Sequence, residues 1–140
     1  GGLAMCLYIP VSGTSALKPT LAEHNVPCYK FLNFKEGQLT SYFLKFPYEI
    51  GKCYTTEEDF SNIAVGGIYF NVIDHGGFHS FIHSCDCHED FSTIREENDE
   101  VVMVRCHIPK GSYYYQGEDM GGAPNYVSQS IVIDEIINDD

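Results

Sequence analysis

The sequence GGIYFNVIDHGGFHSFIHSCDCHEDF, residues 66–91, decides the fold prediction, because it joins a strand pattern to a helix pattern. The apolar run at residues 68–73 predicts a buried strand. Asp74 then occupies the position of a helix N-cap, and a helical pattern of about ten residues follows, with Phe78 and Phe81 on its buried face. We therefore expect the main helix directly after this strand.

The same stretch concentrates possible metal ligands. Histidines at positions 75, 79 and 83 recur every four residues and would form one row along the predicted helix. Neutral imidazole and thiolate are the usual zinc ligands, and the spacing matches no standard zinc module. In the alternative interpretation the histidines line a half-buried flank of the helix without any metal. The candidate zinc ligands are His79, His83, Cys85, Cys87 and His88.

Two glycines at the start of the predicted helix, Gly76 and Gly77, weigh against it. Each costs about 1 kcal/mol relative to alanine inside a helix. They also lie where a strand gives way to a helix, which is the place of a phosphate-binding loop. The further Gly, Lys and Ser/Thr of such a loop are missing, and Asp74 would repel the anion. The sequence therefore contains no P-loop or dinucleotide fingerprint.

The strongest strand pattern of the chain is EVVMVRCHI, residues 100–108. Its apolar residues fall on both faces, which predicts a central strand with Val102, Val104, Cys106 and Ile108 in the core. An acidic loop is predicted over residues 86–100. The pattern as a whole predicts an α+β single domain, with a mostly antiparallel sheet of about six strands and one main helix. Besides 68–73 and 100–108, strands are predicted at 28–34, 42–46, 48–54, 112–115 and 126–137.

Residues 1–27 are predicted to form an N-terminal arm, and residues 28–140 the domain. Three prolines in the arm exclude a long regular element. We expect the arm to wrap the surface or to add an edge strand, and it offers a contact for a second copy. A homodimer is therefore expected. Gly1-Gly2, without an initiator methionine, is interpreted as a cloning remnant.

The composition restricts the class of partner. The 8 basic and 20 acidic residues give a formal net charge of −12, which opposes binding to nucleic acid or to an anionic membrane. Three of the six cysteines, Cys28, Cys53 and Cys106, lie in apolar runs and are expected to act as small hydrophobic residues. We expect reduced thiols and an intracellular protein.

Five short motifs follow one another along the last 110 residues: YKFLN (29–33), FPYEIGKCY (46–54), GIYFNVID (67–74), VVMVRCHIPKGSYYYQG (101–117) and YVSQSIVI (126–133). On these motifs the chain resembles a family of uncharacterised small proteins of large DNA viruses, of the marseillevirus and mimivirus kind, with relatives in bacteriophages. The resemblance implies a viral protein in the host cytoplasm or the virion. It implies nothing about an activity.

The sequence G-I-Y-F, in a strand before a predicted helix, also resembles a motif of ADP-ribosyltransferase-type folds. On that resemblance Tyr69 would match the tyrosine of the middle motif, and Glu135 the late glutamate. The His or Arg that the first strand of that family needs is missing, since the strand here offers only Lys30. The resemblance would imply an enzyme that uses a nicotinamide dinucleotide.

The expected function is that of a binding or structural module that acts through protein–protein contacts, with no catalytic residues and no cofactor. The alternatives are an ADP-ribosyltransferase-like enzyme and a zinc-stabilised interaction module. A nucleophilic pair of Cys106 and His107 is not expected, because adjacent strand residues point to opposite faces of a sheet.

Overall fold

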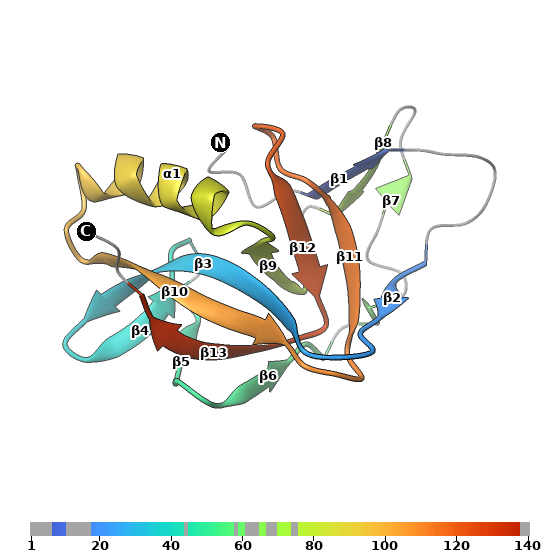
Figure 1. Cartoon of the computed structure of the whole chain (residues 1–140), viewed down its shortest axis with the longest axis horizontal. Helices are drawn as coiled ribbons and strands as arrows, with labels where there is room; N and C mark the ends of the chain where they lie inside the picture. The colour runs from blue at the N-terminus through green and yellow to red at the C-terminus, as the bar shows by residue number, and fades with distance from the viewer. Residues whose placement is uncertain are drawn as a thin grey trace.

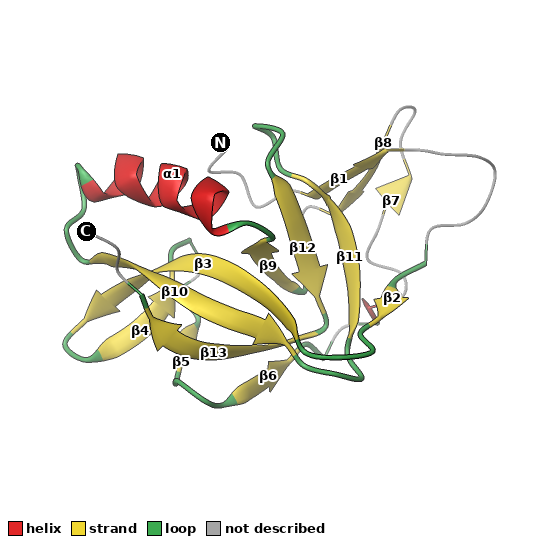
Figure 2. Cartoon of the chain, viewed as in Figure 1, coloured by secondary structure: helices red, strands yellow, loops and turns green. Residues whose placement is uncertain are grey.

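Two long strands, β3 (Val26–Lys35) and β10 (Val101–Ile108), form the centre of the sheet in the computed structural model (Figure 1). Every residue of β10 has a partner on β3, from Val101 opposite Asn33 to Ile108 opposite Val26. The structure describes residues 7–10, 18–43, 45–57, 59–60, 65–66, 70–73 and 76–137. Within them the chain is a single domain, mostly β, with one helix and one large antiparallel sheet (Figure 2).

The strand order along the sheet is β6-β13-β10-β3-β9-β12-β11-β1-β8-β7, with β2 paired to β11 and with β4 and β5 added beside β3. The sheet changes direction where β3 meets β9, because only Tyr29 and Phe81 pair there. As a result β11 and β12 run steeply across the direction of β3 and β10 (Figure 1). The other strands are β1 (Leu7–Pro10), β2 (Thr20–Leu21), β4 (Gln38–Ser41), β5 (Pro47–Tyr48), β6 (Cys53–Thr55), β7 (Val65–Gly66), β8 (Phe70–Ile73), β9 (Phe78–Phe81), β11 (Tyr113–Glu118), β12 (Pro124–Ser128) and β13 (Ser130–Ile136).

The main core lies on one face of the central strands. Val104, Cys106 and Ile108 are completely buried, and Val102 nearly so, as the alternation in the sequence predicts. Cys28, Leu32, Ile131 and Ile133 complete this face from β3 and β13. The other face of β10 also contributes buried side chains, so the prediction of a central strand is confirmed.

The helix α1 (Ser84–Arg95) covers that second face. Cys87, Phe91 and Ile94, at i, i+4 and i+7, form the apolar stripe that packs on the sheet. Asp86 in the first turn and Arg95 in the last suit the charge preference of the two helix ends. The stripe is narrow, and the rest of the helix is polar.

The prediction of the helix position was wrong. The segment expected to be helical forms strand β9, and the segment expected to be an acidic loop, residues 86–100, holds most of α1. Phe78 packs in the main core whereas Phe81 packs under α1, because the two opposite faces of β9 contact two different cores. The predicted N-cap Asp74 lies outside the described residues, as does His75.

Several smaller predictions also need correction. The sheet has thirteen strands among the described residues where about six were expected, since many are only two to four residues long. The described residues of the predicted strand 42–46 form no strand, because they make the turn that follows β4. The long last strand is two strands separated at Gln129. Cys53 is exposed and not in the core, because β6 lies at the end of the sheet.

The N-terminal arm contributes two strands. Its first strand, β1, pairs with β8 on one side and with β11 on the other, so these residues are inside the sheet and not at an edge. Strand β2 pairs with the start of β11. The homodimer stays a prediction. No helix in the described part of the chain has the length and apolar character needed to cross a membrane.

Candidate functional site

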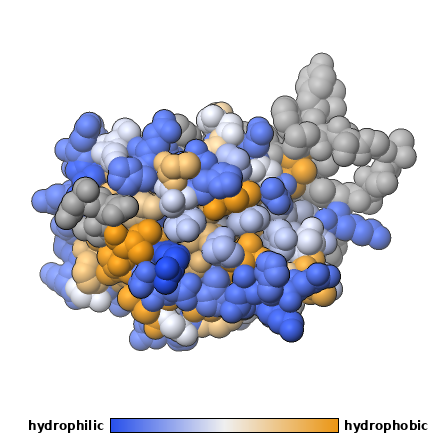
Figure 3. Space-filling view, viewed as in Figure 1, coloured by the Kyte–Doolittle hydropathy of each residue, from blue (hydrophilic) through white to orange (hydrophobic). Residues whose placement is uncertain are grey.

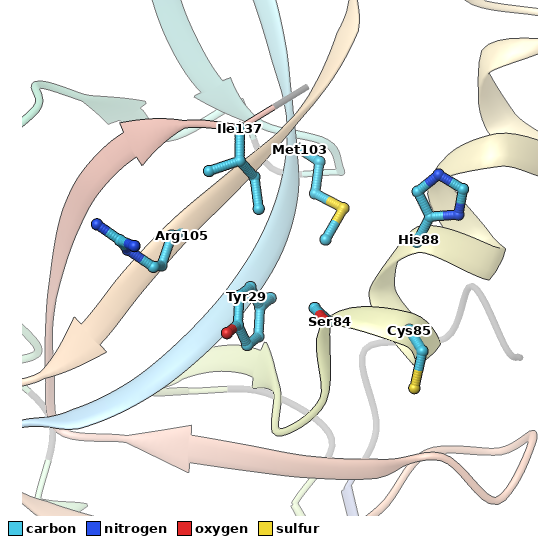
Figure 4. Close-up of a pocket in the computed structure, with 7 residues that line it drawn as sticks. All are labelled: Tyr29, Ser84, Cys85, His88, Met103, Arg105 and Ile137. Atoms are coloured by element: carbon cyan, nitrogen blue, oxygen red, sulfur yellow. The ribbon is translucent and has the colours of Figure 1, made fainter. Parts of the chain in front are cut away.

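A pocket of about 570 Å³ opens between the N-terminal half of α1 and the sheet (Figure 4). The volume is in the usual range for ligand pockets. The sheet contributes Tyr29, Met103 and Arg105, and Ile137 follows β13, while the opposite wall is made by α1. The α1 residues that line it are Ser84, Cys85 and His88. The pocket lies on the face of β3 and β10 that α1 only partly covers.

The lining combines an apolar floor with a polar rim. The thioether of Met103 and the ring of Tyr29 lie in the middle of the pocket, between the helix and β10 (Figure 4). Met103 is almost fully buried. The guanidinium group of Arg105 lies on the side away from α1 (Figure 4). The site can therefore take a group with an apolar body and a polar end.

The cation at the rim already has a partner. Arg105 forms an ion pair with Glu135, with 3.0 Å between Nη2 and Oε1, and both side chains are about half exposed. A bulge in β13 causes this arrangement, since Arg105 faces Glu135 whereas Cys106 faces Ile133. The extra residue, Asp134, accepts from Nδ1 of His107 at 2.9 Å. The bulge thus places two acids beside two basic side chains of β10.

The first turn of α1 forms the other rim of the pocket. Its N-cap residue, His83, makes no side-chain hydrogen bond to the helix. His88, one turn further on, lies within 3.4 Å of the hydroxyl of Ser92 and stacks at an angle on Phe91. Cys85 is an exposed free thiol. The helix therefore presents a hydroxyl, a thiol and an imidazole to the pocket.

The five residues predicted as zinc ligands lie on two different elements. His79 is on β9, His83 is the N-cap residue of α1, and the other three lie on the helix itself. Cys87 is completely buried in the core under the helix, and burial raises the pKa of its thiol. In the described part of the chain, no three His, Cys, Asp or Glu side chains are close enough to hold an ion.

Burial strongly perturbs the imidazole of His79. Its Nε2 is completely buried and has no hydrogen-bond partner. Burial, and then the positive charge of Lys30, lower the pKa of His79 to about 3, although a backbone hydrogen bond with Gly76 acts in the other direction. The Lys30 amine donates a hydrogen bond to the carbonyl oxygen of His79. The imidazole is therefore neutral in the folded protein at neutral pH.

We predict that this histidine makes the protein less stable in acid. An unfolded histidine has a pKa of about 6.5, so between about pH 6.5 and pH 3 the unfolded chain binds one proton more than the folded one. The free energy of unfolding should therefore fall by about 2 kcal/mol from pH 7 to pH 5 because of His79 alone. Urea denaturation at several pH values, compared between the wild type and His79→Gln, measures this contribution.

The matched control is His24→Gln, because His24 is exposed. This variant should keep the pH profile of the wild type, whereas His79→Gln should flatten it between pH 5 and pH 7. An unchanged profile for His79→Gln would mean that the imidazole can reach solvent and protonate in the folded state.

Of the two residues that the ADP-ribosyltransferase resemblance singles out, Tyr69 and Glu135, the structure describes only Glu135. Tyr69 lies outside the described residues. Glu135 is on β13, where it is engaged with Arg105. Cys106 and His107 point to opposite faces as predicted, since Cys106 is in the main core and His107 bonds to Asp134 on the other face.

The sequence prediction missed every residue of the pocket except Cys85 and His88. A usable signal was present for the helix wall, because Cys87, Phe91 and Ile94 have helical spacing across the acidic segment. For Tyr29, Met103 and Arg105 the alternation of β3 and β10 predicts a shared face, but not where the helix leaves it open. Comparison with protein-family models, with curated proteins and with solved structures found no match for this chain.

Proposed function

We propose that the protein is a binding module that holds a segment of a partner protein in the pocket between α1 and the sheet. The observation that carries the proposal is the pocket itself, whose floor of Tyr29, Met103 and Ile137 suits an apolar side chain. Apolar surface gathers over the end of β13 and the neighbouring part of β10 (Figure 3). A partner segment could extend over that surface.

The charges favour a basic partner segment. Arg105 is the one cationic side chain among the described lining residues, and Glu135 already neutralises it. An anionic ligand would have to displace Glu135 and approach a chain of net charge −12. A segment that alternates apolar and basic residues meets neither obstacle, and the negative field would speed its association.

The experiment uses two labelled peptides of equal length, one alternating leucine with lysine and one alternating leucine with glutamate. Binding to the full chain is measured by fluorescence anisotropy, and the site is located from the changes in backbone amide NMR shifts. We expect the basic peptide to bind and to shift the amides of Tyr29, Ser84 and His88. Preferential binding of the acidic peptide, or shifts scattered over the surface, would contradict the proposal.

A variant that fills the pocket separates specific binding from general charge attraction. Cys85→Phe places a ring at the helix wall of the pocket, where the native thiol is exposed. It should weaken binding of the basic peptide by about tenfold, which corresponds to about 1.4 kcal/mol. Thr93→Phe adds the same ring at an exposed position of α1 that does not line the pocket, so it should leave the affinity unchanged.

A further inference from the structure

The centre of the sheet contains two thiols that face each other. Cys28 on β3 and Cys106 on β10 are directly opposite in the antiparallel register, and their Sγ atoms are 3.2 Å apart. Both residues are completely buried, and both are free. Directly paired strand residues have Cα atoms about 4.5–5.5 Å apart, within the range that a disulfide bridges. Only the sulfur atoms would have to approach further.

The surroundings make the two sulfurs unequal. Burial alone would raise the pKa of Cys28, but the hydrogen bond with Cys106, the nearby hydroxyl of Ser80 and the charge of Lys30 outweigh it, so the pKa of Cys28 is lowered. Burial and the hydrogen bond with Cys28 raise the pKa of Cys106. One thiol therefore ionises first, and its neighbour keeps its proton.

A lysine sits next to the pair. Lys30 is two residues beyond Cys28 on the same face of β3, and its amine is held by the carbonyl oxygen of His79. Burial lowers the pKa of Lys30, while interactions with Cys106, Cys28 and Cys87 favour its charged form. A thiolate at Cys28 and an ammonium group at Lys30 thus stabilise one another inside the core. Such a cationic neighbour is typical of reactive cysteines.

We propose that Cys28 and Cys106 are a redox-active dithiol, in which Cys28 reacts with a peroxide and Cys106 resolves the product into a disulfide. The Cys28 thiolate attacks one peroxide oxygen of hydrogen peroxide, the O–O bond breaks, and with one proton a water molecule leaves, which gives a sulfenic acid. The Cys106 sulfur then attacks the Cys28 sulfur, its proton joins the departing hydroxyl as a second water, and the S–S bond forms. The two thiols are oxidised, and the peroxide is reduced to two waters.

The location explains which oxidant can act and what the bond would do. A completely buried pair is closed to a bulky disulfide reagent, whereas hydrogen peroxide has only one oxygen atom more than water. The bridge would join residues 78 positions apart in the chain, so it would constrain the unfolded state strongly. The neighbouring pair on the opposite face, Tyr29 and Arg105, lines the pocket, but the dithiol proposal does not depend on what the pocket binds.

The test is performed on the Cys53→Ser, Cys85→Ser double variant, which removes the two thiols that are exposed among the described residues and keeps the buried Cys28, Cys87 and Cys106. Folded protein is treated with hydrogen peroxide, denatured in the presence of an alkylating agent and mapped by mass spectrometry. We expect a cross-linked peptide containing Cys28 and Cys106, a raised thermal midpoint, and reversal of both by dithiothreitol. A folded protein in which both cysteines stay alkylatable, or in which either pairs with another cysteine, overturns the proposal.

Two further variants in the same background assign the roles. Cys106→Ala should leave Cys28 to form a sulfenic acid, detected by dimedone adduct formation, whereas Cys28→Ala should leave Cys106 unmodified. Circular dichroism confirms that each variant is folded before treatment. Equal dimedone labelling of the two cysteines would overturn the assignment of Cys28 as the reacting thiol. If a variant does not fold, the cross-linked peptide of the parent protein still decides whether the dithiol forms.

Discussion

Replacing Phe91 with alanine is expected to lower the free energy of unfolding by about 3–5 kcal/mol, the largest effect predicted for this protein. Phe91 is 2% exposed and lies at the centre of the contact between α1 and the sheet. Val101 and Met103 surround it from β10, and Phe81 from β9. Because these side chains belong to separate elements, they cannot collapse together into the space that the ring leaves. Urea denaturation followed by far-ultraviolet circular dichroism measures the loss.

Thr93→Ala is the matched control for this change. Thr93 is on the exposed side of the same helix, and its hydroxyl donates to the backbone carbonyl oxygen of Glu89 one turn before. Its removal should change the free energy of unfolding by about 0.5 kcal/mol or less. A loss below about 1 kcal/mol for Phe91→Ala would mean that residues 86–100 form the solvated loop that the acidic composition suggests, and that α1 does not pack on the sheet.

The central strands could be predicted from the sequence because their pattern has little ambiguity. In β10 five of the first six residues are apolar, and a strand with two apolar faces has to be central. Strand β3 was predicted from its alternating pattern, and the structure extends it by only a few residues. The short strands were missed because two to four residues carry too little periodicity to identify them, and partners distant in the sequence decide whether they pair.

The helix was misplaced because the segment that forms β9 has the stronger apolar pattern of helical spacing, whereas the segment that forms α1 is mostly acidic. The segment around Phe78, His79 and Phe81 has apolar residues at helical spacing, but these residues face two different cores as a strand. The helix itself has a narrow apolar stripe within an acidic sequence, so its hydrophobic signal is weak. Tertiary packing of Phe91 and Ile94 on the sheet stabilises the helix, and the spacing of its few apolar residues is only a weak local signal for it.

The pocket could not be predicted because it depends on where the helix begins over the sheet. Tyr29 and Arg105 are opposite one another on β3 and β10, and nothing in their local sequence distinguishes them from Phe31, two residues further along the same face, which packs in the core under α1. The Cys28–Cys106 pair is hidden for the same reason. Both cysteines were predicted to be buried, but that they are direct neighbours follows only from the register of the two strands.

Gly76 and Gly77, directly before β9, are the sequence signal against a helix at this position. Gly77 has φ of +68°, in the left-handed region where other residues are strained. A Cβ atom at this position would lie 2.6 Å from Cγ1 of the buried Val127 and 3.1 Å from the carbonyl oxygen of Ser128. Gly77 is therefore needed both for its backbone conformation and for the close approach of β12.

Gly77→Ala is expected to lower the free energy of unfolding by about 2–5 kcal/mol, because it adds overpacking of about 1–3 kcal/mol to a left-handed backbone penalty of about 1–2 kcal/mol. Gly37→Ala is the matched control, since Gly37 has φ of +79° and a Cβ atom there would meet nothing within 4 Å. It should show the backbone penalty alone, and the difference between the two variants in urea denaturation isolates the steric contribution. Equal losses would mean that β12 does not approach Gly77 this closely, and that the start of β9 has room for a side chain.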